Sequence, residues 1–263
     1  GKLTPISESG NATKAFFLDG KPLALSEDSP ECGGGRCLIS VDPRTGTKEI
    51  ISLKNVRGHL GDLKPSPDGK SLLIQEAFDG IDSLWIAKLK SKSIVPVVPN
   101  FLNGSYVVWN TRWFSSSEVV FTVENIGQPA FIRSFDLKTK KTTVWTRPRL
   151  PEALTGTVKP PETIRWRSFD SKEISGYIVR PAKIAAKSPV LVFIHGGPQV
   201  IDRPTFNPVD LRFATFLGMS VIHTNIRGSR GFGNEFMDAD NGGKREGAVR
   251  DIGALLDWIA KQP

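Results

Sequence analysis

The N-terminal part of this 263-residue chain repeats with a period near 48, and a repeat of that length limits the possible folds more than any other feature. Asp19-Gly20-Lys21 returns as Asp68-Gly69-Lys70. Leu89-Lys90-Ser91-Lys92 returns as Leu137-Lys138-Thr139-Lys140, and Val41 to Gly46 has the same phase one period earlier. Three units therefore share one sequence pattern.

Each unit alternates polar turns with short apolar segments. The turn Ser66-Pro67-Asp68-Gly69 precedes one such segment, and runs of this kind bounded by Gly, Asp and Ser predict β-strands. The expected strands in the last two units are Leu72 to Ile74, Ser83 to Leu89, Ile94 to Val98, Glu118 to Val123, Ala130 to Leu137 and Thr142 to Trp145.

A period of 40 to 50 residues with three or four strands per unit favours propeller blades over the alternative, a β-sandwich with accidental internal similarity. Propellers need about four to eight blades to close a ring. Residues 1–150 are therefore expected to form part of a β-propeller, with about three blades.

The pattern changes in residues 151–161, where prolines cluster and periodicity is lost, so this segment is predicted to be a linker. After it, strands and helices alternate in the order β-β-β-α-β-α, which predicts an α/β domain whose later strands are parallel. The expected strands are Glu162 to Phe169, Glu173 to Val179, Val190 to Ile194 and Met219 to Thr224. The expected helices are Val209 to Leu217, stopped by Gly218, and one carrying Val249, Ile252, Leu255, Leu256 and Ile259.

Two expectations concern the surface of this sheet. Val190 to Ile194 is apolar throughout, which is typical of a parallel strand covered on both faces. Met219 to Thr224 is expected to present an open edge, where a further strand would pair.

The strand Val190 to Ile194 runs directly into His195-Gly196-Gly197-Pro198. Sites in α/β proteins lie at the carboxyl ends of parallel strands, and a glycine there leaves its backbone N–H open to approach. In α/β-hydrolases a donor after the third strand supplies half of the oxyanion hole. The alternative is an ordinary tight turn between a strand and a helix.

Together with Asn225 to Gly233 and Arg250 to Pro263, this turn resembles the prolyl oligopeptidase family of serine peptidases, in particular its acylaminoacyl-peptidase and dipeptidyl-peptidase-like branches. The resemblance is specific over residues 160–263 and architectural over 1–150. It implies a β-propeller portion followed by the N-terminal part of an α/β-hydrolase catalytic domain, residues 162–263.

The resemblance also implies roles for single residues. The Gly197 backbone N–H would be the oxyanion donor, and His195 would be structural, fixing the turn with Gly196 and Pro198. The family often has two acids where this chain has Asp251 and Ile252, so a pairing that needs the second acid is in doubt. The residues expected to shape the next turn between strand and loop are Asn225, Arg227, Gly228 and Gly231.

No complete Ser-Asp-His triad is expected within the chain. Ser229 lacks the glycine two positions earlier that a nucleophile elbow requires, and it follows the fourth strand instead of the fifth. His223 is expected to be a packed strand residue. The family places the nucleophile beyond Pro263, so this chain alone is predicted to be inactive and to need the missing C-terminal half of the hydrolase domain.

The expected function is that of a serine peptidase which hydrolyses peptide or acyl-amide bonds in short peptides through an acyl-enzyme. No metal or organic cofactor is implied. One alternative is an esterase or isopeptide hydrolase of the same fold, and another is a non-catalytic propeller binding protein. The sequence leaves the oligomeric state open, including a homo-oligomer.

Charge and cysteine content narrow the possible partners only slightly. The net charge is +8, but Lys and Arg are dispersed among acids, and the densest cluster, Lys138 to Lys141, falls in a predicted hairpin turn, so no nucleic-acid surface is expected. No apolar run approaches the roughly 18 residues of a membrane helix. A Cys32–Cys37 disulfide would favour an exported protein, whereas two free thiols would suit the cytoplasm, so the location stays open.

Overall fold

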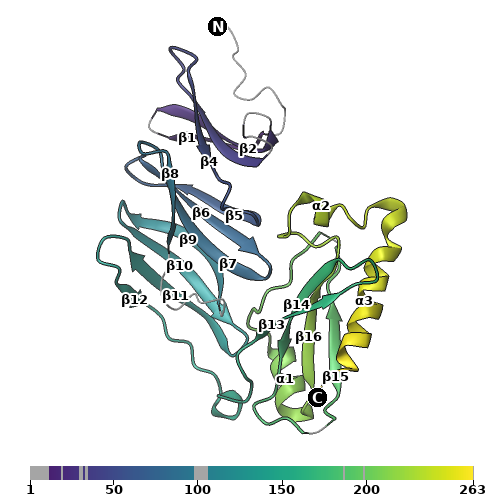
Figure 1. The fold of residues 1–263 in the computed structure, drawn as a ribbon. Coiled ribbons are helices and arrows are strands. Elements are labelled where there is room, and N and C mark those ends of the chain that lie inside the picture. The colour runs from purple at the N-terminus through teal and green to yellow at the C-terminus, as the bar shows by residue number, and fades with distance from the viewer. Residues whose placement is uncertain are drawn as a thin grey trace.

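The structure is a computed structural model that describes residues 12–18, 20–29, 32, 35–97, 106–185, 187–197 and 199–262. Asp19 and Pro198, which entered the sequence analysis, lie outside this description. Three antiparallel sheets occupy the N-terminal part of the chain, and a mixed sheet with helices occupies the C-terminal part (Figure 1).

Each of the three N-terminal sheets has four strands that neighbour one another in chain order, as in a propeller blade. The first blade has β1 (Ala12–Leu18), β2 (Lys21–Ser29), β3 (Gly35–Val41) and β4 (Lys48–Ser52). The second has β5 (His59–Pro65), β6 (Ser71–Phe78), β7 (Ile81–Lys88) and β8 (Ser93–Val97). The third has β9 (Val107–Ser115), β10 (Glu118–Asn125), β11 (Gln128–Asp136) and β12 (Thr142–Val144). The predicted partial propeller is confirmed.

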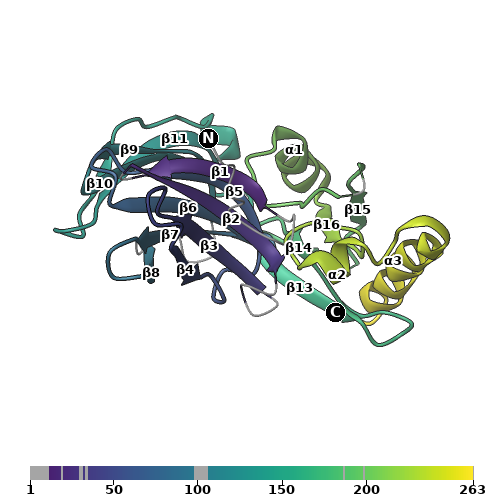
Figure 2. The same ribbon diagram turned by 90° about the horizontal axis from the view of Figure 1, so that it is seen from above.

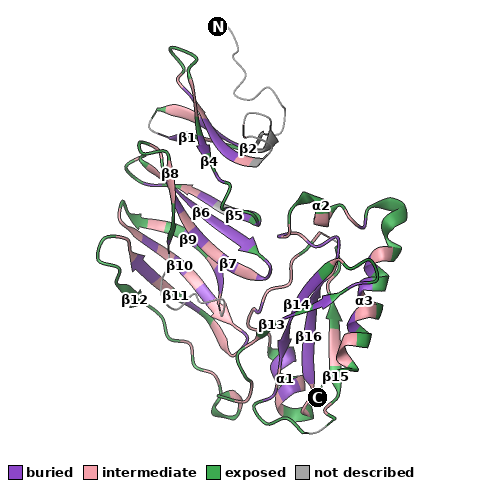
Figure 3. Ribbon diagram, in the orientation of Figure 1, coloured by how far each residue is buried: buried purple, intermediate pink, exposed green. Residues whose placement is uncertain are grey.

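The three blades lie one above another in Figure 1 and overlap in the view from above (Figure 2). Successive residues of β6 point to opposite faces of its sheet. Leu72 and Ile74 therefore pack toward the first blade, in a cluster with Leu25 and Leu38, whereas Leu73 packs toward the third. Strand β6 is buried on both faces, and this packing holds the three blades together (Figure 3).

The sequence pattern missed the first strands of the second and third blades, β5 and β9. Residues His59–Pro65 include Gly61, Asp62 and a terminal proline, residue types that are rare in strands. The segment nevertheless forms β5, because β6 offers it an antiparallel ladder. The tertiary partner thus outweighs the local preference.

The C-terminal sheet consists of β13 (Glu162–Arg167), β14 (Glu173–Val179), β15 (Val190–Ile194) and β16 (Ser220–Asn225), in the spatial order β13-β14-β16-β15. Strands β15 and β16 are parallel, as expected. Helix α1 (Pro208–Leu217) contacts β16, helix α3 (Glu246–Ile259) contacts β13, and the short α2 (Asn234–Met237) follows the β16 loop.

Two expectations about this sheet were wrong. Strand β16, expected at the open edge, lies between β14 and β15, and all of its residues are buried. The open edge belongs to β15, whose Val190, Phe193 and Ile194 are exposed, so this strand is not covered on both faces. The crossover through α1 brings the chain back on the inner side of β15, beside β14, and so reverses the expected order.

The two longer helices cover opposite faces of the mixed sheet. The Asn207 side chain caps α1 by accepting the Val209 N–H at 2.9 Å, and Gly218 ends the helix in the left-handed conformation, as predicted. On one face, Phe213 of α1 packs on Val221. On the other, Leu255 of α3 packs with Trp166 and Ile222. No described helix is long and apolar enough to span a membrane.

The segment predicted as a linker is held against the C-terminal sheet by backbone hydrogen bonds. The Lys159 N–H donates to the Arg180 carbonyl, and the Ala182 N–H donates to the Thr157 carbonyl. The domain boundaries at 150 and 162 stay predictions.

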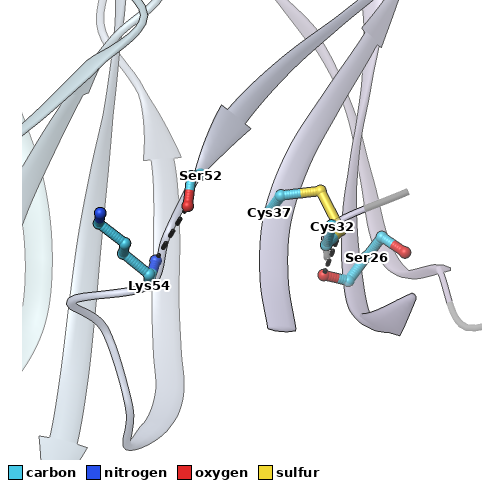
Figure 4. The surroundings of a disulfide bond; sticks show 5 residues. All are labelled: Ser26, Cys32, Cys37, Ser52 and Lys54. Atoms are coloured by element: carbon cyan, nitrogen blue, oxygen red, sulfur yellow. Dashed lines mark hydrogen bonds between the residues drawn. A yellow bond between two sulfur atoms is a disulfide. The ribbon is translucent and has the colours of Figure 1, made fainter. Parts of the chain in front are cut away.

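Cys32 and Cys37 form a disulfide beside the β2–β3 hairpin of the first blade (Figure 4). Their Cα atoms are 5.4 Å apart, a separation that a disulfide spans without backbone movement. Cys37 is fully buried on β3. Of the two alternatives that the sequence left open, the structure contains the bonded pair.

Candidate active site

The turn after β15 holds Gly197 in a conformation that suits glycine alone. Its φ is 91°, and a Cβ at this position would lie 3.1 Å from Val200 Cγ2. Gly197 is exposed, and within the described part of the chain its N–H has no backbone acceptor. A free N–H at the carboxyl end of a parallel strand can donate to an incoming oxygen.

His195 connects this turn to the next loop. Its Nε2 lies 2.9 Å from the Ser229 hydroxyl, which donates its single proton to the Ile226 carbonyl at 2.6 Å. The hydroxyl must therefore accept from Nε2–H. Ser229 is fully buried with its proton engaged, an arrangement that supports its exclusion as a nucleophile.

Asn225, at the end of β16, positions the segment that follows the glycine turn. Its side-chain oxygen accepts the Asp202 N–H at 2.8 Å, and its Nδ2 donates to the Asp202 carbonyl at 3.0 Å. The side chain thereby replaces a backbone partner for Asp202. The loop after Gly197 is held to the interior strand of the sheet.

His223 lies buried in a row of rings across three strands. It stacks on Tyr177 of β14 at 4.6 Å and on Phe193 of β15 at 5.1 Å, each its register partner. Its Nδ1 lies 3.3 Å from Asp202 Oδ2, and its Nε2 lies 2.9 Å from Asp210 Oδ2. Burial alone would lower the pKa of His223, but the hydrogen bonds to the two carboxylates outweigh it and raise this pKa to about 9.

An imidazolium held in this way is a structural ion and not a general base. The strand packing predicted for His223 is present, but its two carboxylate partners were not foreseen. Asp202 and Asp210 lie in a loop and on a helix, and no local sequence pattern connects them to a strand residue.

Arg227 joins three elements through two ion pairs, a buried one with Asp251 and a partly exposed one with Asp170. Its backbone N–H and its Nε donate to Asp251 of α3 at 3.0 and 2.9 Å, and its Nη1 donates to Asp170 at 2.9 Å. The hydrogen bond from Arg227 lowers the pKa of Asp170 to about 2. Asp251 alone occupies the inner edge of the guanidinium, while Ile252 lines an apolar groove. The two acids that pair with Arg227 are therefore Asp251 and Asp170, and position 252 contributes none.

Gly228 and Gly231 have φ values of 96° and 91°, and their surroundings leave no room for a side chain. A Cβ on Gly228 would lie 2.4 Å from the Asp240 carboxyl carbon. A Cβ on Gly231 would lie 2.5 Å from Ile201 Cδ1. A side chain at either position would therefore require the turn after β16 to shift.

The sequence analysis did not identify the residues that connect the blades to this site. Arg203 donates to both oxygens of Asp82 on β7, and its guanidinium lies 4.0 Å from the centre of the Trp109 ring. Asp79 forms an ion pair with Arg165 and accepts from the Ser175 hydroxyl. The Arg203 contact fixes the loop after Gly197 against the second blade, and Asp79 connects the turn between β6 and β7 to β13 and β14. No local period predicts them, because the partners are far apart in the chain.

An apolar groove of about 500 Å³ lies beside the glycine turn. Ile194 and Gly197 line one side, and Val249, Ile252 and Leu256 of α3 line the other. Val249 and Leu256 are more than half exposed, so α3 presents a second apolar face away from the sheet.

No protein-family model matches the chain. Curated relatives match it over part of its length. The uncharacterized peptidase YuxL of Bacillus subtilis is 33% identical over 93 residues, which are 34% of this chain and 14% of that protein. The dipeptidyl aminopeptidase BIII of Pseudoxanthomonas mexicana is 30% identical over 103 residues, 36% of this chain and 15% of that enzyme.

Among solved structures, a prolyl endopeptidase superimposes on 95% of this chain with a TM-score of 0.76 and 19% identity. At that identity the likeness concerns the fold alone. The match covers 36% of the endopeptidase chain. This chain therefore spans about a seventh of the curated relatives and about a third of the solved enzyme.

Proposed function

We propose, from the premise that this chain belongs to the prolyl oligopeptidase and acylaminoacyl-peptidase family, that the protein containing it is a serine peptidase acting on short peptides. The single observation that carries the proposal is the Gly197 turn. There an exposed backbone N–H at the end of a parallel strand lacks a backbone acceptor within the described residues. The same turn is anchored through His195 and Asn225.

In this proposal Gly197 stabilises the oxyanion that develops when a nucleophile attacks the scissile carbonyl. Donors that are already in place cost no reorganisation during the reaction, and each is worth roughly 100- to 1,000-fold in rate. His195 and Asn225 act as positioning residues, because they hold the loops on either side of Gly197. The acyl-enzyme would form on a serine outside the described residues.

The chain alone is proposed to be inactive. The Ser229 hydroxyl donates to a backbone carbonyl, and His223 is enclosed by two carboxylates. Within the described residues, neither can take the role of nucleophile or base.

The remaining part of a hydrolase domain is proposed to dock at β15. That strand has an unpaired edge, and the groove between Ile194 and α3 is apolar. A further parallel strand would satisfy the backbone groups of the edge, and its flanking residues would cover Val249 and Leu256.

The first test is fluorophosphonate labelling of the full-length protein, analysed by denaturing mass spectrometry. We expect one labelled serine outside this chain and no label on the chain expressed alone. Peptide and ester substrates are then compared by kcat/KM. Turnover of esters without peptides would exclude the peptidase, and absence of both label and turnover would favour the binding protein.

Gly197 is tested separately. Gly197→Ala is expected to lower kcat/KM at least about tenfold, because the residue has a positive φ and its new methyl would press on Val200. Gly196→Ala is the matched control, because a Cβ there has open space and φ is not positive. A structure of the phosphonylated protein should place the phosphonyl oxygen about 2.7–3.1 Å from Gly197 N.

A further inference from the structure

A second cavity, of about 270 Å³, lies between the blades and the loop after β16. Lys14, Arg36, Arg57 and His59 line it from the first two blades, and Arg230 lines it from the opposite side. Every charged residue among its described lining residues is therefore basic.

Several of the cations around this cavity have no ionic partner among the described residues. Lys14 donates to the Gly61 carbonyl, a neutral partner. Arg57 and Arg230 form no ion pair with the described residues. The neighbouring Glu76 carboxylate is already engaged, because it accepts the backbone N–H groups of Arg57 and Gly58 at 2.6 Å each and the Trp85 indole N–H at 2.8 Å.

His59 responds to this environment. Partial burial lowers its pKa, and the charges of Arg230, Lys14 and Arg36 lower it further, to about 4. At neutral pH its imidazole is uncharged and can donate one hydrogen bond to an anion. A cavity whose cations oppose the protonation of a histidine within it is suited to a negative ligand.

The cavity is directly connected to the glycine turn. The Arg230 N–H donates to the Val200 carbonyl at 3.1 Å, and the preceding residue, Ser229, accepts from His195. Gln199 also lines the cavity. It is two residues from Gly197, a span of at most about 7 Å along the chain. A short peptide bound at Gly197 can therefore place a neighbouring group in the cavity.

We propose that this cavity binds a carboxylate of a short peptide ligand, with Arg57 and Arg230 as the principal contacts from the blade side and the sheet side. The carboxylate is either the free C-terminus or an acidic side chain. That the peptide is also a substrate rests on the function proposed above, whereas the binding site itself does not.

Binding is measured on the full-length protein with the serine identified by fluorophosphonate labelling replaced by alanine, so that no turnover intervenes and the Gly197 turn stays open. Where no serine is labelled, the native protein is used. The probes are acetyl-tetra-alanine, its C-terminal amide, and acetyl-Ala-Ala-Asp-Ala amide. Their affinities are measured by isothermal titration calorimetry at low salt. We expect at least one carboxylate probe to bind about tenfold more tightly than the uncharged amide. The preference should shrink as ionic strength rises. The two carboxylate probes distinguish the C-terminus from a side chain.

Arg57→Gln and Arg230→Gln should each reduce the preference for a carboxylate several-fold, and the double variant should remove it. Arg149→Gln makes the same charge change at an exposed position just before the predicted linker, and it should leave the preference intact. Equal affinity for all three probes, or a preference that survives the double variant, would overturn the proposal. Because the readout is affinity, the proposal can fail while labelling still confirms a serine hydrolase, and the reverse also holds.

Discussion

Arg203 reaches across from the loop after Gly197 to Asp82 of the second blade, with Nη1 at 3.0 and 2.9 Å from the two carboxylate oxygens. Asp82 is almost fully buried, and burial raises the pKa of its carboxyl against the opposing effect of Arg203. Such a pair is costly to break from one side, because the remaining charge stays in the interior without a partner.

Arg203→Gln should therefore lower the free energy of unfolding by roughly 3–5 kcal/mol, measured by urea denaturation at pH 7. Asp82→Asn combined with Arg203→Gln should cost less than Arg203→Gln alone, because no buried charge remains. Arg167→Gln, which removes an exposed pair with Glu173, should cost less than about 1 kcal/mol. Equal losses for Arg203→Gln and Arg167→Gln would show that the contact between blade and sheet contributes little.

The His223 site predicts a pH dependence of stability. The folded pKa of about 9 lies above the ordinary value of 6.5, so the folded state holds the proton more tightly. The stabilisation is fully present below pH 6.5 and is lost as pH rises through 9. At about 1.4 kcal/mol for each unit by which the pKa is raised, this proton contributes roughly 3 kcal/mol to the free energy of unfolding.

The urea concentration at the unfolding midpoint of the native protein should decrease as the pH is raised from 6.5 to 9. The midpoint of His223→Gln should change much less over the same range. Of the groups around His223, Tyr177 does not add to this change, because burial raises its pKa far beyond the range measured. The other groups that face His223 are the carboxylates of Asp202 and Asp210. A parallel decline in both proteins would assign the pH dependence to other groups.

Two glycines should respond to alanine in opposite directions. Gly228→Ala should destabilise the protein by about 2–3 kcal/mol or more, because φ is 96° and the new methyl would overlap the Asp240 carboxylate. Gly253→Ala lies within α3 with open space around it and should stabilise by up to about 1 kcal/mol. Thermal melts of the two variants test this. A neutral Gly228→Ala would mean that the loop after β16 can relax.

The Cys32–Cys37 bond closes a small loop in the first blade. Loop-closure entropy predicts that Cys32→Ser with Cys37→Ser costs about 2 kcal/mol. Hydrogen exchange should increase most in β2 and β3, because the bond lies beside that hairpin. Alkylation before and after reduction, followed by mass spectrometry, establishes the bond itself. Two thiols alkylated before reduction would contradict it.

Local patterns predicted many of the elements. The repeat gave the blades because each blade uses the same turn, with Gly20 and Gly69 both at a φ of 69°. Strands β14 and β15 have the predicted bounds, and α1 begins within one residue of its prediction. The short strand β12 and helix α3 were also foreseen. The missed strand β5 has a composition typical of loops and forms only beside β6.

The candidate site was foreseen only where it is contiguous in the chain. At Gly197, Gly228 and Gly231 the residue type alone indicates a turn, because a positive φ is a local requirement that glycine meets. The partners of His195, His223 and Arg227 carry no such signal. Asp251 lies 24 positions from Arg227, and Asp79 lies 96 positions from Ser175.

The sequence by itself therefore determined the three repeated blades, the alternation of strands and helices after them, and the glycine turn at the end of β15. Only the tertiary structure decided that β16 lies inside the sheet, that β15 provides the open edge, and that Arg203 meets Asp82 across 121 positions. The physical reason is the distance along the chain over which each interaction acts. Turn conformation and side-chain periodicity act over a few residues, whereas strand order and buried ion pairs depend on which distant segments share a dry interface.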